Sequence, residues 1–420
     1  MSTGKKNVPE IRFGGFSEPW AQRKFRDTFD IMQNNALSRA DLSSAGGDVM
    51  NVHYGDVLVK YGEVLDVKKD EMTYLLDASL VNKHLASLLQ NRDIIIADAA
   101  EDETVGKCSE IAGLTDEKVL SGLHTIPCRP RGNFAEGYLG YYMNSGSYHD
   151  QLLPLIQGAK VSSISKSVIQ DTDIMYPKAE TEQRQIGTYF RCLDNLIPLH
   201  QHKYESLVAV KKAMLEKMFP KEGETVPEIR FSGFTDPWEQ RKLGEIFEEY
   251  SEKGHPELPA LTIIQGGGTI RRDESDRSLQ YDRASLSNYK MVNDGDFIVH
   301  LRSFEGGLEK ATTLGIISPA YHTFHGEGTD SRFYYSYFRS PKFIDQDLKP
   351  HVYGIRDGRS IDIEGMKTIE IPWTSFDEQK AIGDYIDTLD NLITLHQRKC
   401  EVLKNLKSAL LNKMFVNTTE

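Results

Sequence analysis

Polar and basic side chains gather beside glycines at several points of the sequence, in a pattern that suits contact with nucleic acid. Arginine pairs bidentately with guanine, lysine and serine reach phosphate, and glycine lets a loop approach a groove closely. For any one of these residues a solvated surface loop is the commoner explanation. The candidate contacts are Lys60, Lys107, Lys160, Ser162, Ser163, Lys166, Arg271, Arg272, Arg302, Ser303, Arg356 and Arg359.

Two of these clusters occupy matching places in the chain. The stretch 157–166 and its counterpart each come shortly before a long amphipathic segment. An offset of 196 residues carries Gly158 onto Gly354 and Lys160 onto Arg356. Because the clusters correspond, we expect them to be equivalent loops in two related domains.

The sequence lacks the motifs of nucleotide-dependent enzymes and of amino-methyltransferases. It has no phosphate-binding loop, no glycine-rich cofactor loop, and no Asn or Asp followed by two prolines and an aromatic residue. The nearest approach, Thr235–Trp238, has one proline and belongs to a repeated segment. We therefore expect a non-catalytic chain with no metal and no cofactor of its own.

The composition is typical of a folded, soluble protein. Of the 420 residues, 39% are hydrophobic and 27% charged, and no apolar run is long enough to span a bilayer, so we expect a cytoplasmic protein. The four cysteines are widely spaced and lack a C-x-x-C pair, which indicates reduced thiols. The net charge of -12 argues against non-specific coating of nucleic acid, although a large acidic protein can carry local basic clefts.

The chain contains two internal repeats, which we call the frame segments. Residues 8–25 return at 226–243 with 13 of 18 positions identical, and residues 182–219 return at 378–415 with 22 of 38 identical. The offsets are 218 and 196 residues, so the inserts between the repeats differ in length, and they differ in sequence as well. Two similar frames around two dissimilar inserts indicate two related but non-identical binding tasks.

The longer frame segments show the apolar spacing of coiled-coil helices. Apolar residues recur on a seven-residue grid with a second set four residues later. Each helix of 38 residues would run about 57 Å. The expected seam residues are Ile186, Leu193, Ile197, Leu207, Met214, Ile382, Leu389, Ile393, Leu403 and Leu410.

Two arrangements suit these helices. Each helix could pack on its own neighbouring domain, or the two near-identical stripes could pair with each other as an antiparallel coiled coil with pseudo-two-fold symmetry. The repeat favours pairing. The N-terminal frame segment can then complete the second helix only if the chain ends lie close together.

The inserts predict mixed α/β domains. Short β-rich runs occur at 56–60, 92–97 and 296–301, and helical patches at 137–156 and 331–345. The expected class is α+β, with two such domains joined by the two helices. The expected boundaries are 1–181 for the first domain, 182–222 for the central helix, 223–377 for the second domain and 378–420 for the C-terminal helix.

The frame segments resemble the conserved regions of type I restriction-modification specificity subunits. The resemblance lies in the shared residues of the two long repeats, which begin Glu-Gln-x-x-Ile-Gly, and in the VPEIRF and PW segments of the short repeats. It extends over the whole chain, and the stretches 97–107 and 354–361 resemble the family's variable target-recognition domains.

The resemblance implies a DNA-binding subunit whose two domains each read one half of a split DNA target. It implies double-stranded DNA, two methyltransferase subunits and restriction-translocase subunits as partners, and it places S-adenosylmethionine, ATP and magnesium on those partners. The alternative is a coiled-coil scaffold that holds two protein-interaction domains and does not bind DNA, which the acidic net charge slightly favours.

Overall fold

The computed structural model divides the chain into two compact units. The first comprises residues 1–200 and 398–420, and the second comprises residues 201–397. Each unit therefore contains one insert and a part of each long helix. The residues described are 7–158, 161–275, 283–300, 302–354 and 360–417.

The long helices form where the repeats predict them. Helix α5 spans Glu180–Lys217 and helix α10 spans Phe376–Lys413, and each has 38 residues. Both begin and end two residues earlier than the predicted segments. Acidic residues in the first turns and a lysine in each last turn suit the helix dipole. Helix α5 continues through Pro198, which has no N–H to donate to the preceding turn.

The two helices run antiparallel in the first unit. Lys407 Nζ lies 2.6 Å from Asp194 Oδ1, and Cys400 Sγ donates to Ile197 O at 3.9 Å, so rising numbers on α5 meet falling numbers on α10. In the second unit Lys211 contacts Asp390 at 2.5 Å. The predicted pairing of the helices is confirmed within each unit.

All ten predicted seam residues are buried or half-buried. Toward the helix ends they pack into the inserts as well: Ile186, Leu193 and Leu410 belong to the core of the first unit, and Ile382 belongs to that of the second. Both arrangements considered from the sequence therefore contribute to the structure, because the helices pair with each other and also complete the cores of the inserts.

The insert of the first unit contains a five-stranded and a four-stranded sheet. The five-stranded order is β2 (Phe29–Ile31), β11 (Thr125–Pro130), β7 (Ile94–Ala97), β9 (Cys108–Ala112) and β5 (Val64–Asp66). The four-stranded order is β10 (Lys118–Ser121), β4 (Val49–Val52), β6 (Thr73–Leu75) and β3 (Leu42–Ser43). Strands β8 (Ala99–Ala100) and β12 (Ser162–Ser163) form a separate pair.

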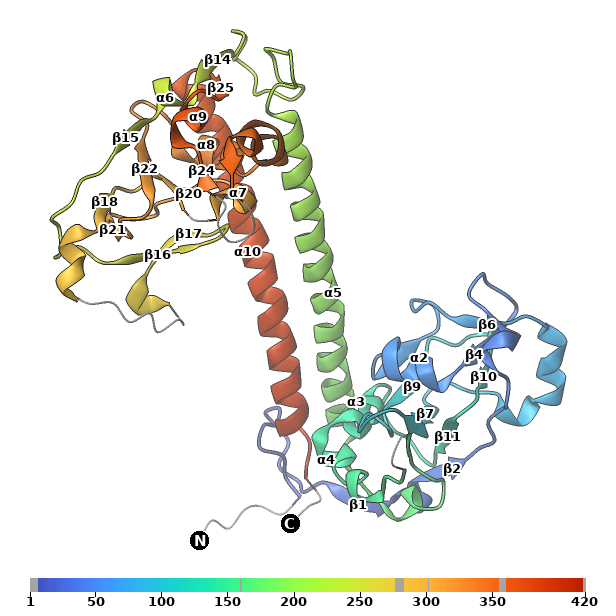
Figure 1. Ribbon diagram of the computed structural model, residues 1–420. Coiled ribbons are helices and arrows are strands. Elements are labelled where there is room, and N and C mark those ends of the chain that lie inside the picture. The colour runs from blue at the N-terminus through green and yellow to red at the C-terminus, as the bar shows by residue number, and fades with distance from the viewer. Residues whose placement is uncertain (1–6, 159–160, 276–282, 301, 355–359, 418–420) are drawn as a thin grey trace. The chain divides into compact units, whose positions relative to one another are not determined.

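Short helices cover the sheets of the first unit. Helices α3 (Tyr138–Asn144) and α4 (Gly146–His149) lie beside the part of α5 that belongs to this unit (Figure 1). Their tyrosines form the centre of the core with Phe190 and Phe415. The remaining helices are α1 (Phe25–Thr28) and α2 (Tyr54–Val59).

Among the described residues, the insert of the second unit contains one four-stranded sheet and three strand pairs, and its strand β25 (Glu370–Trp373) also pairs with β14 (Glu239–Lys242) of the short frame segment. The sheet order is β15 (Glu248–Tyr250), β22 (His322–His325), β19 (Phe297–Val299) and β20 (Glu309–Lys310). The pairs are β16 (Leu261–Ile264) with β17 (Gly268–Arg271), β18 (Lys290–Val292) with β21 (Gly315–Ile317), and β23 (Val352–Tyr353) with β24 (Ser360–Ile361). The helices are α6 (Leu243–Ile246), α7 (Ser303–Gly306), α8 (Ser331–Phe338) and α9 (Ile363–Lys367).

The two inserts share a central strand arrangement despite their dissimilar sequences. Strand β11 lies between β2 and β7, and β22 lies between β15 and β19, with all pairings antiparallel. A buried aspartate precedes the inner strand in both. Asp93 pairs with Arg129 at 2.7 Å, and Asp296 pairs with His325 at 2.7 Å. Strand β7 is therefore the counterpart of β19.

The predicted strand at 56–60 is wrong, because these residues belong to helix α2 and its C-terminal cap. His53 Nδ1 accepts a hydrogen bond from Gly55 N at 3.2 Å and caps the helix. Val57 is fully buried while Val59 is 87% exposed. A short apolar run cannot distinguish a strand from one helical turn.

Candidate functional site

A buried ion pair connects the short frame segment to the long helix in the first unit. Arg12 Nε and Nη2 donate to the two carboxylate oxygens of Glu182 at 2.7 and 2.8 Å. Trp20 Nε1 donates to the same carboxylate at 3.2 Å. Glu182 is 1% exposed, so three donors are needed to satisfy its charge.

The same contacts recur in the second unit. Arg230 donates to Glu378 at 2.6 and 2.8 Å, and Trp238 Nε1 donates to Glu378 at 3.0 Å. Thr374 also donates its hydroxyl to Glu378 at 2.5 Å. These contacts explain why Arg, Trp and Glu recur in the frame segments, although they lie far apart in the sequence.

The short frame segments also attach to the far ends of the long helices. Ile11 N donates to Lys413 O at 3.0 Å in the first unit, and Ile229 N donates to Lys217 O at 2.9 Å in the second. The N-terminal segment therefore completes helix α10, as the repeat predicts. Ile11 and Lys413, which are 402 residues apart in the sequence, are consequently neighbours in the first unit.

The Gln and Gly of each long repeat fix the turn before α3 or α8. Gln183 Oε1 accepts from Ala135 N at 3.0 Å, and Gln379 Oε1 accepts from Asp330 N at 3.0 Å. A Cβ on Gly187 would lie 2.8 Å from Glu136 O, so a side chain there would crowd the turn. The Glu-Gln-x-x-Ile-Gly pattern therefore encodes the junction between helix and insert.

Lys60 and Lys107 occupy different surroundings in the first unit. Lys60 is exposed at the end of α2, 3.7 Å from Glu71. Lys107 turns inward and donates to Leu58 O at 2.8 Å. Burial lowers the pKa of Lys107.

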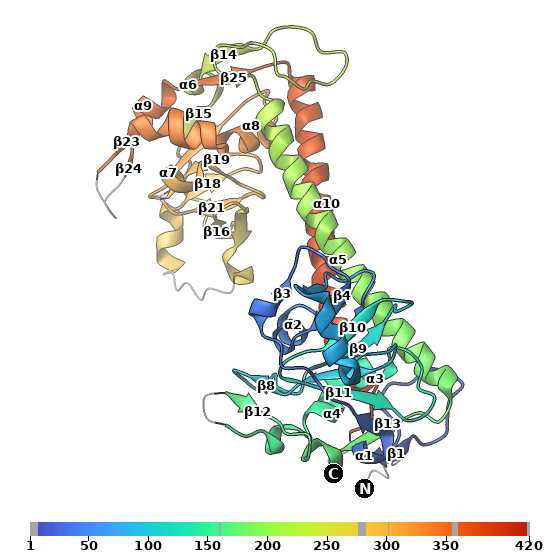
Figure 2. The same cartoon turned by 90° about the vertical axis from the view of Figure 1, so that its right-hand side faces the viewer.

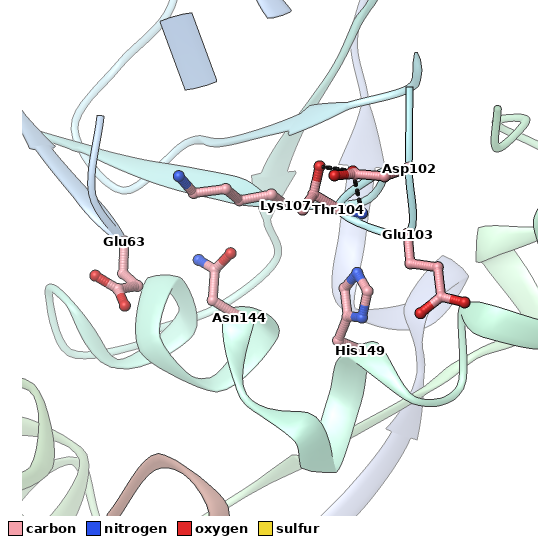
Figure 3. A pocket seen from close by; sticks show the side chains of 7 residues that line it. All are labelled: Glu63, Asp102, Glu103, Thr104, Lys107, Asn144 and His149. Atoms are coloured by element: carbon pink, nitrogen blue, oxygen red, sulfur yellow. Dashed lines mark hydrogen bonds between the residues drawn. The ribbon is translucent and has the colours of Figure 1, made fainter. Parts of the chain in front are cut away.

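Lys107 lies in a pocket whose other charged groups are mainly acidic (Figure 3). Figure 3 shows Glu63, Glu103 and His149 around it, and Asp102 accepts a hydrogen bond from Thr104. Three carboxylates make this pocket unfavourable for phosphate.

Lys166, Ser162 and Ser163 lie close together at the β8–β12 pair. Both serines belong to β12, whose partners are Ala99 and Ala100. Lys166 Nζ donates to Asn34 Oδ1 at 3.1 Å. Lys160, predicted with them, lies outside the described residues, as do Arg356 and Arg359 in the second insert.

Arg271 and Arg272 lie at the end of β17 in the second unit. Arg271 is exposed and forms a bidentate pair with Asp273 at 2.8 and 3.0 Å. Arg272 stacks over the ring of Tyr289 at 5.2 Å and donates to its hydroxyl at 3.2 Å. Both guanidinium groups therefore have partners within the insert.

Arg302 and Ser303 follow β19. Arg302 is exposed, whereas Ser303 is fully buried and its hydroxyl accepts from His300 N at 2.9 Å. Ser303 thus holds the turn that presents Arg302. The predicted residues of the second unit are not gathered into one cluster in the described parts of the insert.

A group of polar and aromatic residues that the sequence pattern does not reveal lies near Lys166. Asp98 and Tyr54 each contact His124, and Asn34 contacts Lys166 and the carbonyl of Gly122. Gly122, two residues before His124, is the one sequence signal of the turn that carries this histidine.

Several apolar side chains remain exposed on the middle turns of the long helices. In the first unit Leu199 is 60% and Leu406 is 39% exposed, and in the second unit Leu395 is 43% and Val210 is 40% exposed. The 196-residue offset relates Leu199 to Leu395 and Val210 to Leu406, so each unit carries an equivalent pair. We call these four residues the helix patches. Exposed apolar groups that recur in this way suit a protein partner.

The described residues contain neither a metal-ligand cluster nor a membrane-spanning helix. They contain no group of three or more His, Cys, Asp or Glu that could hold a metal ion. No helix in the described ranges is long and apolar enough to cross a bilayer. Cys108, Cys128 and Cys400 are buried, and Cys192 is exposed.

The chain is similar to known specificity subunits. No protein-family model matches it. A chain from Methanocaldococcus jannaschii, provisionally named the type I restriction enzyme MjaX specificity subunit, is 23% identical over 433 residues, or 97% of this chain and 95% of the relative. The MjaVIII specificity subunit from the same organism is 26% identical over 275 residues, or 61% of this chain and 64% of the relative.

The fold is also that of a solved protein. The crystal structure of the S subunit of a type I restriction-modification system from M. genitalium matches with a TM-score of 0.57 at 12% identity, over 98% of this chain and 100% of the other. Over nearly its whole length the chain thus resembles type I restriction-modification specificity subunits, in sequence and in fold, as its frame segments indicate.

Proposed function

We propose that this chain is the specificity subunit of a type I restriction-modification complex and that it reads a split DNA target. The observation that carries the proposal is the pair of equivalent buried contacts, Arg12 with Glu182 and Arg230 with Glu378. They hold two inserts whose central strands correspond while their surface residues differ. One insert would read one half of the target, and the other insert would read the second half.

The long helices would set the length of the unread gap between the two halves. A helix rises about 1.5 Å per residue and is stiff over its length, so a paired helix of fixed length suits a spacer. Adding or removing whole helical turns should change the gap and leave both half-sites unchanged.

The helix patches would bind the partner subunits. Leu199 with Leu406, and Leu395 with Val210, present equivalent apolar surface to two copies of one partner. Two methyltransferase subunits fit this duplication, and restriction-translocase subunits would join that assembly. S-adenosylmethionine, ATP and magnesium would belong to those partners. The chain itself would do no chemistry and would act in the cytoplasm, where the DNA is.

The testing experiment is single-molecule sequencing of methylated adenines in DNA from cells that express the chain with its cognate methyltransferase. The expected result is a split motif that depends on the chain. Replacing residues 26–181 by another recognition insert should change one half of the motif only. If no methylation depends on the chain, or if both halves change together, the proposal fails and a scaffold without DNA binding takes its place.

A further inference from the structure

We infer that each insert contacts the bases of its half-site with one end of its central strands, which we call a reading edge. The inference rests on the proposed function and adds the surface that does the reading. The first reading edge consists of Asn34, Tyr54, Asp98, His124 and Lys166. The second consists of Lys290, His300, Arg302 and Tyr321.

The two reading edges occupy equivalent places. In the first unit Ala97, the last residue of β7, is paired with Thr125, the first residue of β11. In the second unit Val299, the last residue of β19, is paired with His322, the first residue of β22. The residues that follow β7 or β19 therefore meet those that precede β11 or β22.

The contacts of Asp93 with Arg129 and of Asp296 with His325 lie at the opposite end of these strands. Each central sheet therefore has a buried aspartate contact at one end and its reading edge at the other.

Loops from separate parts of the chain converge at the first reading edge. Asp98 Oδ1 lies 3.1 Å from His124 Nδ1, and the ring of Tyr54 lies 5.2 Å from that of His124. Asn34 Nδ2 donates to Gly122 O at 3.3 Å and its oxygen accepts from Lys166. Figure 2 shows α2, β8 and β12, the elements around this edge, along one side of the unit.

His124 has an unusual backbone conformation at this edge. Its φ is 53°, in the left-handed region that few residues other than glycine adopt. Its side chain is 51% exposed and is oriented by Asp98. Residues in such conformations cluster at functional sites, where the surrounding structure enforces them. Here the turn presents an oriented imidazole to solvent.

The side chains of the first reading edge suit base recognition. Asparagine pairs with adenine, a carboxylate accepts from cytosine, and lysine contacts phosphate. Asp98 is the single carboxylate among the five named residues, in contrast to the acidic pocket around Lys107. DNA therefore fits the edge better than the pocket.

The second reading edge carries a different and more basic set. The ring of Tyr321 lies 6.2 Å from that of His300, and Lys290 Nζ donates to Tyr321 O at 2.5 Å. Arg302 is exposed beside them, and its backbone N donates to His300 Nδ1 at 3.3 Å. An exposed arginine at this place suits a guanine, which the first edge has no arginine to read.

The test compares adenine methylation patterns of cells expressing the full chain and its methyltransferase, with single substitutions at each edge. His124→Asn keeps a residue that tolerates the left-handed conformation. It should lower discrimination in one half of the motif by about 5- to 100-fold and leave the other half unchanged. Arg302→Gln should do the same in the other half. Lys118→Gln, at the far end of β10 from Gly122, and Lys349→Gln are the matched controls, which should leave both halves unchanged.

The possible results distinguish a failure of the reading edges from a failure of the proposed function. If the wild-type chain directs a split motif but His124→Asn and Arg302→Gln keep wild-type base preferences, the reading edges are wrong while the proposed function stands. If the wild-type chain directs no methylation, the proposed function itself fails. A variant that still reads the other half is assembled with its methyltransferase. Thermal unfolding of each purified variant, compared with the wild-type chain, shows whether the substituted insert is folded, and a variant with a wild-type transition but unchanged base preferences contradicts the reading edges.

Discussion

Arg12 and Glu182 lie 170 residues apart in the sequence and form a two-fold hydrogen-bonded ion pair at 2.7 and 2.8 Å. Their side chains are 11% and 1% exposed. The pair attaches the N-terminal frame segment to the first turn of α5. Arg230 and Glu378 attach the second short frame segment to the first turn of α10 in the same way. A carboxylate buried to this degree pays a large desolvation cost when a charged donor is removed from it.

Arg12→Ala should therefore destabilise the first unit by about 3–5 kcal/mol, because it leaves the Glu182 carboxylate buried with Trp20 alone among these donors. Native-state hydrogen exchange of the β7 and β11 amides measures the free energy of opening of this unit. Arg184→Ala is the matched control. Its pair with Glu180 is on the surface, so a loss of about 1 kcal/mol or less is expected. Equal losses from both variants would contradict the buried role of Arg12.

Gly140 in α3 should not tolerate a side chain. A Cβ there would lie 2.2 Å from Glu63 O and 3.0 Å from Glu110 Cβ. Gly140→Ala should cost about 1–3 kcal/mol from overpacking, even though alanine favours a helix by about 1 kcal/mol. Gly14→Ala, where a Cβ meets nothing within 4 Å, should change stability by about 0.5 kcal/mol or less. Denaturant unfolding of the two variants tests the difference.

The frame could be predicted from the sequence because its pattern is repeated. A seven-residue apolar grid specifies a paired helix, and the duplicated segments require the chain ends to meet, which Ile11 and Lys413 do. The individual contacts could not be predicted in the same way. Arg12 and Glu182 are neighbours only because the chain returns, and no local pattern records that return.

The inserts were less predictable because their strands are short. The run at 56–60 has the composition of a strand, but His53 caps it as a helix and Asp56 turns inward to Arg39. Residue type alone predicts the candidate DNA contacts, and it cannot reveal that Lys107 faces a carbonyl or that Ser303 is buried. Nor can it reveal that Lys166 contacts Asn34, which lies 132 residues earlier.

The stability of the first unit should depend on pH through Glu110. Burial raises the pKa of its carboxyl from 4.5 to about 7, although Gly137 N and Gly140 N donate to it. A raised folded-state pKa means that the protonated form is favoured in the folded unit. The contribution is therefore complete below pH 4.5 and is lost as the pH rises through about 7.

The free energy of unfolding should fall by about 3 kcal/mol between these two pH values, since one pKa unit is worth about 1.4 kcal/mol. Glu110→Gln should remove most of this dependence, because an amide does not ionise. Unfolding free energies of both chains at pH 5 and pH 8 measure it, with the exposed Glu103→Gln as the control that keeps it. If Glu110→Gln keeps the pH dependence of the wild-type unfolding free energy, groups other than Glu110 cause that dependence.

Lys407 and Lys211 occupy equivalent positions on the paired helices but should contribute differently to the free energy of unfolding. Lys407 Nζ lies 2.6 Å from Asp194 and 2.7 Å from Glu63, and its side chain is 17% exposed. Lys211 contacts Asp390, whose side chain is 48% exposed. Lys407→Ala should cost about 3 kcal/mol because two carboxylates lose their cation. Lys211→Ala should cost about 0.2–1 kcal/mol.

Denaturant unfolding of the two variants gives a direct comparison, since the same substitution is made at matched helix positions. Lys407→Ala should lower the free energy of unfolding more than Lys211→Ala does. Its effect should be smaller when Glu63→Gln is also present, because fewer negative charges then remain close together. If the two substitutions lower the free energy of unfolding equally, the inward position of Lys407 adds no stability.

The helix patches should bind the methyltransferase. Leu199→Asp places a charge on a side chain that is 60% exposed, so it should leave the first unit folded while weakening binding of a partner that covers the patch. At least about tenfold weaker binding is expected, since a buried unpaired charge costs well over 1.4 kcal/mol. Val59→Asp is the control, because Val59 is 87% exposed and belongs to α2, outside the helix patches. Co-purification and calorimetric titration with the methyltransferase measure both. Equal affinity for the two variants would show that the partner binds elsewhere, and the recurrence of Leu199 as Leu395 would then need another cause.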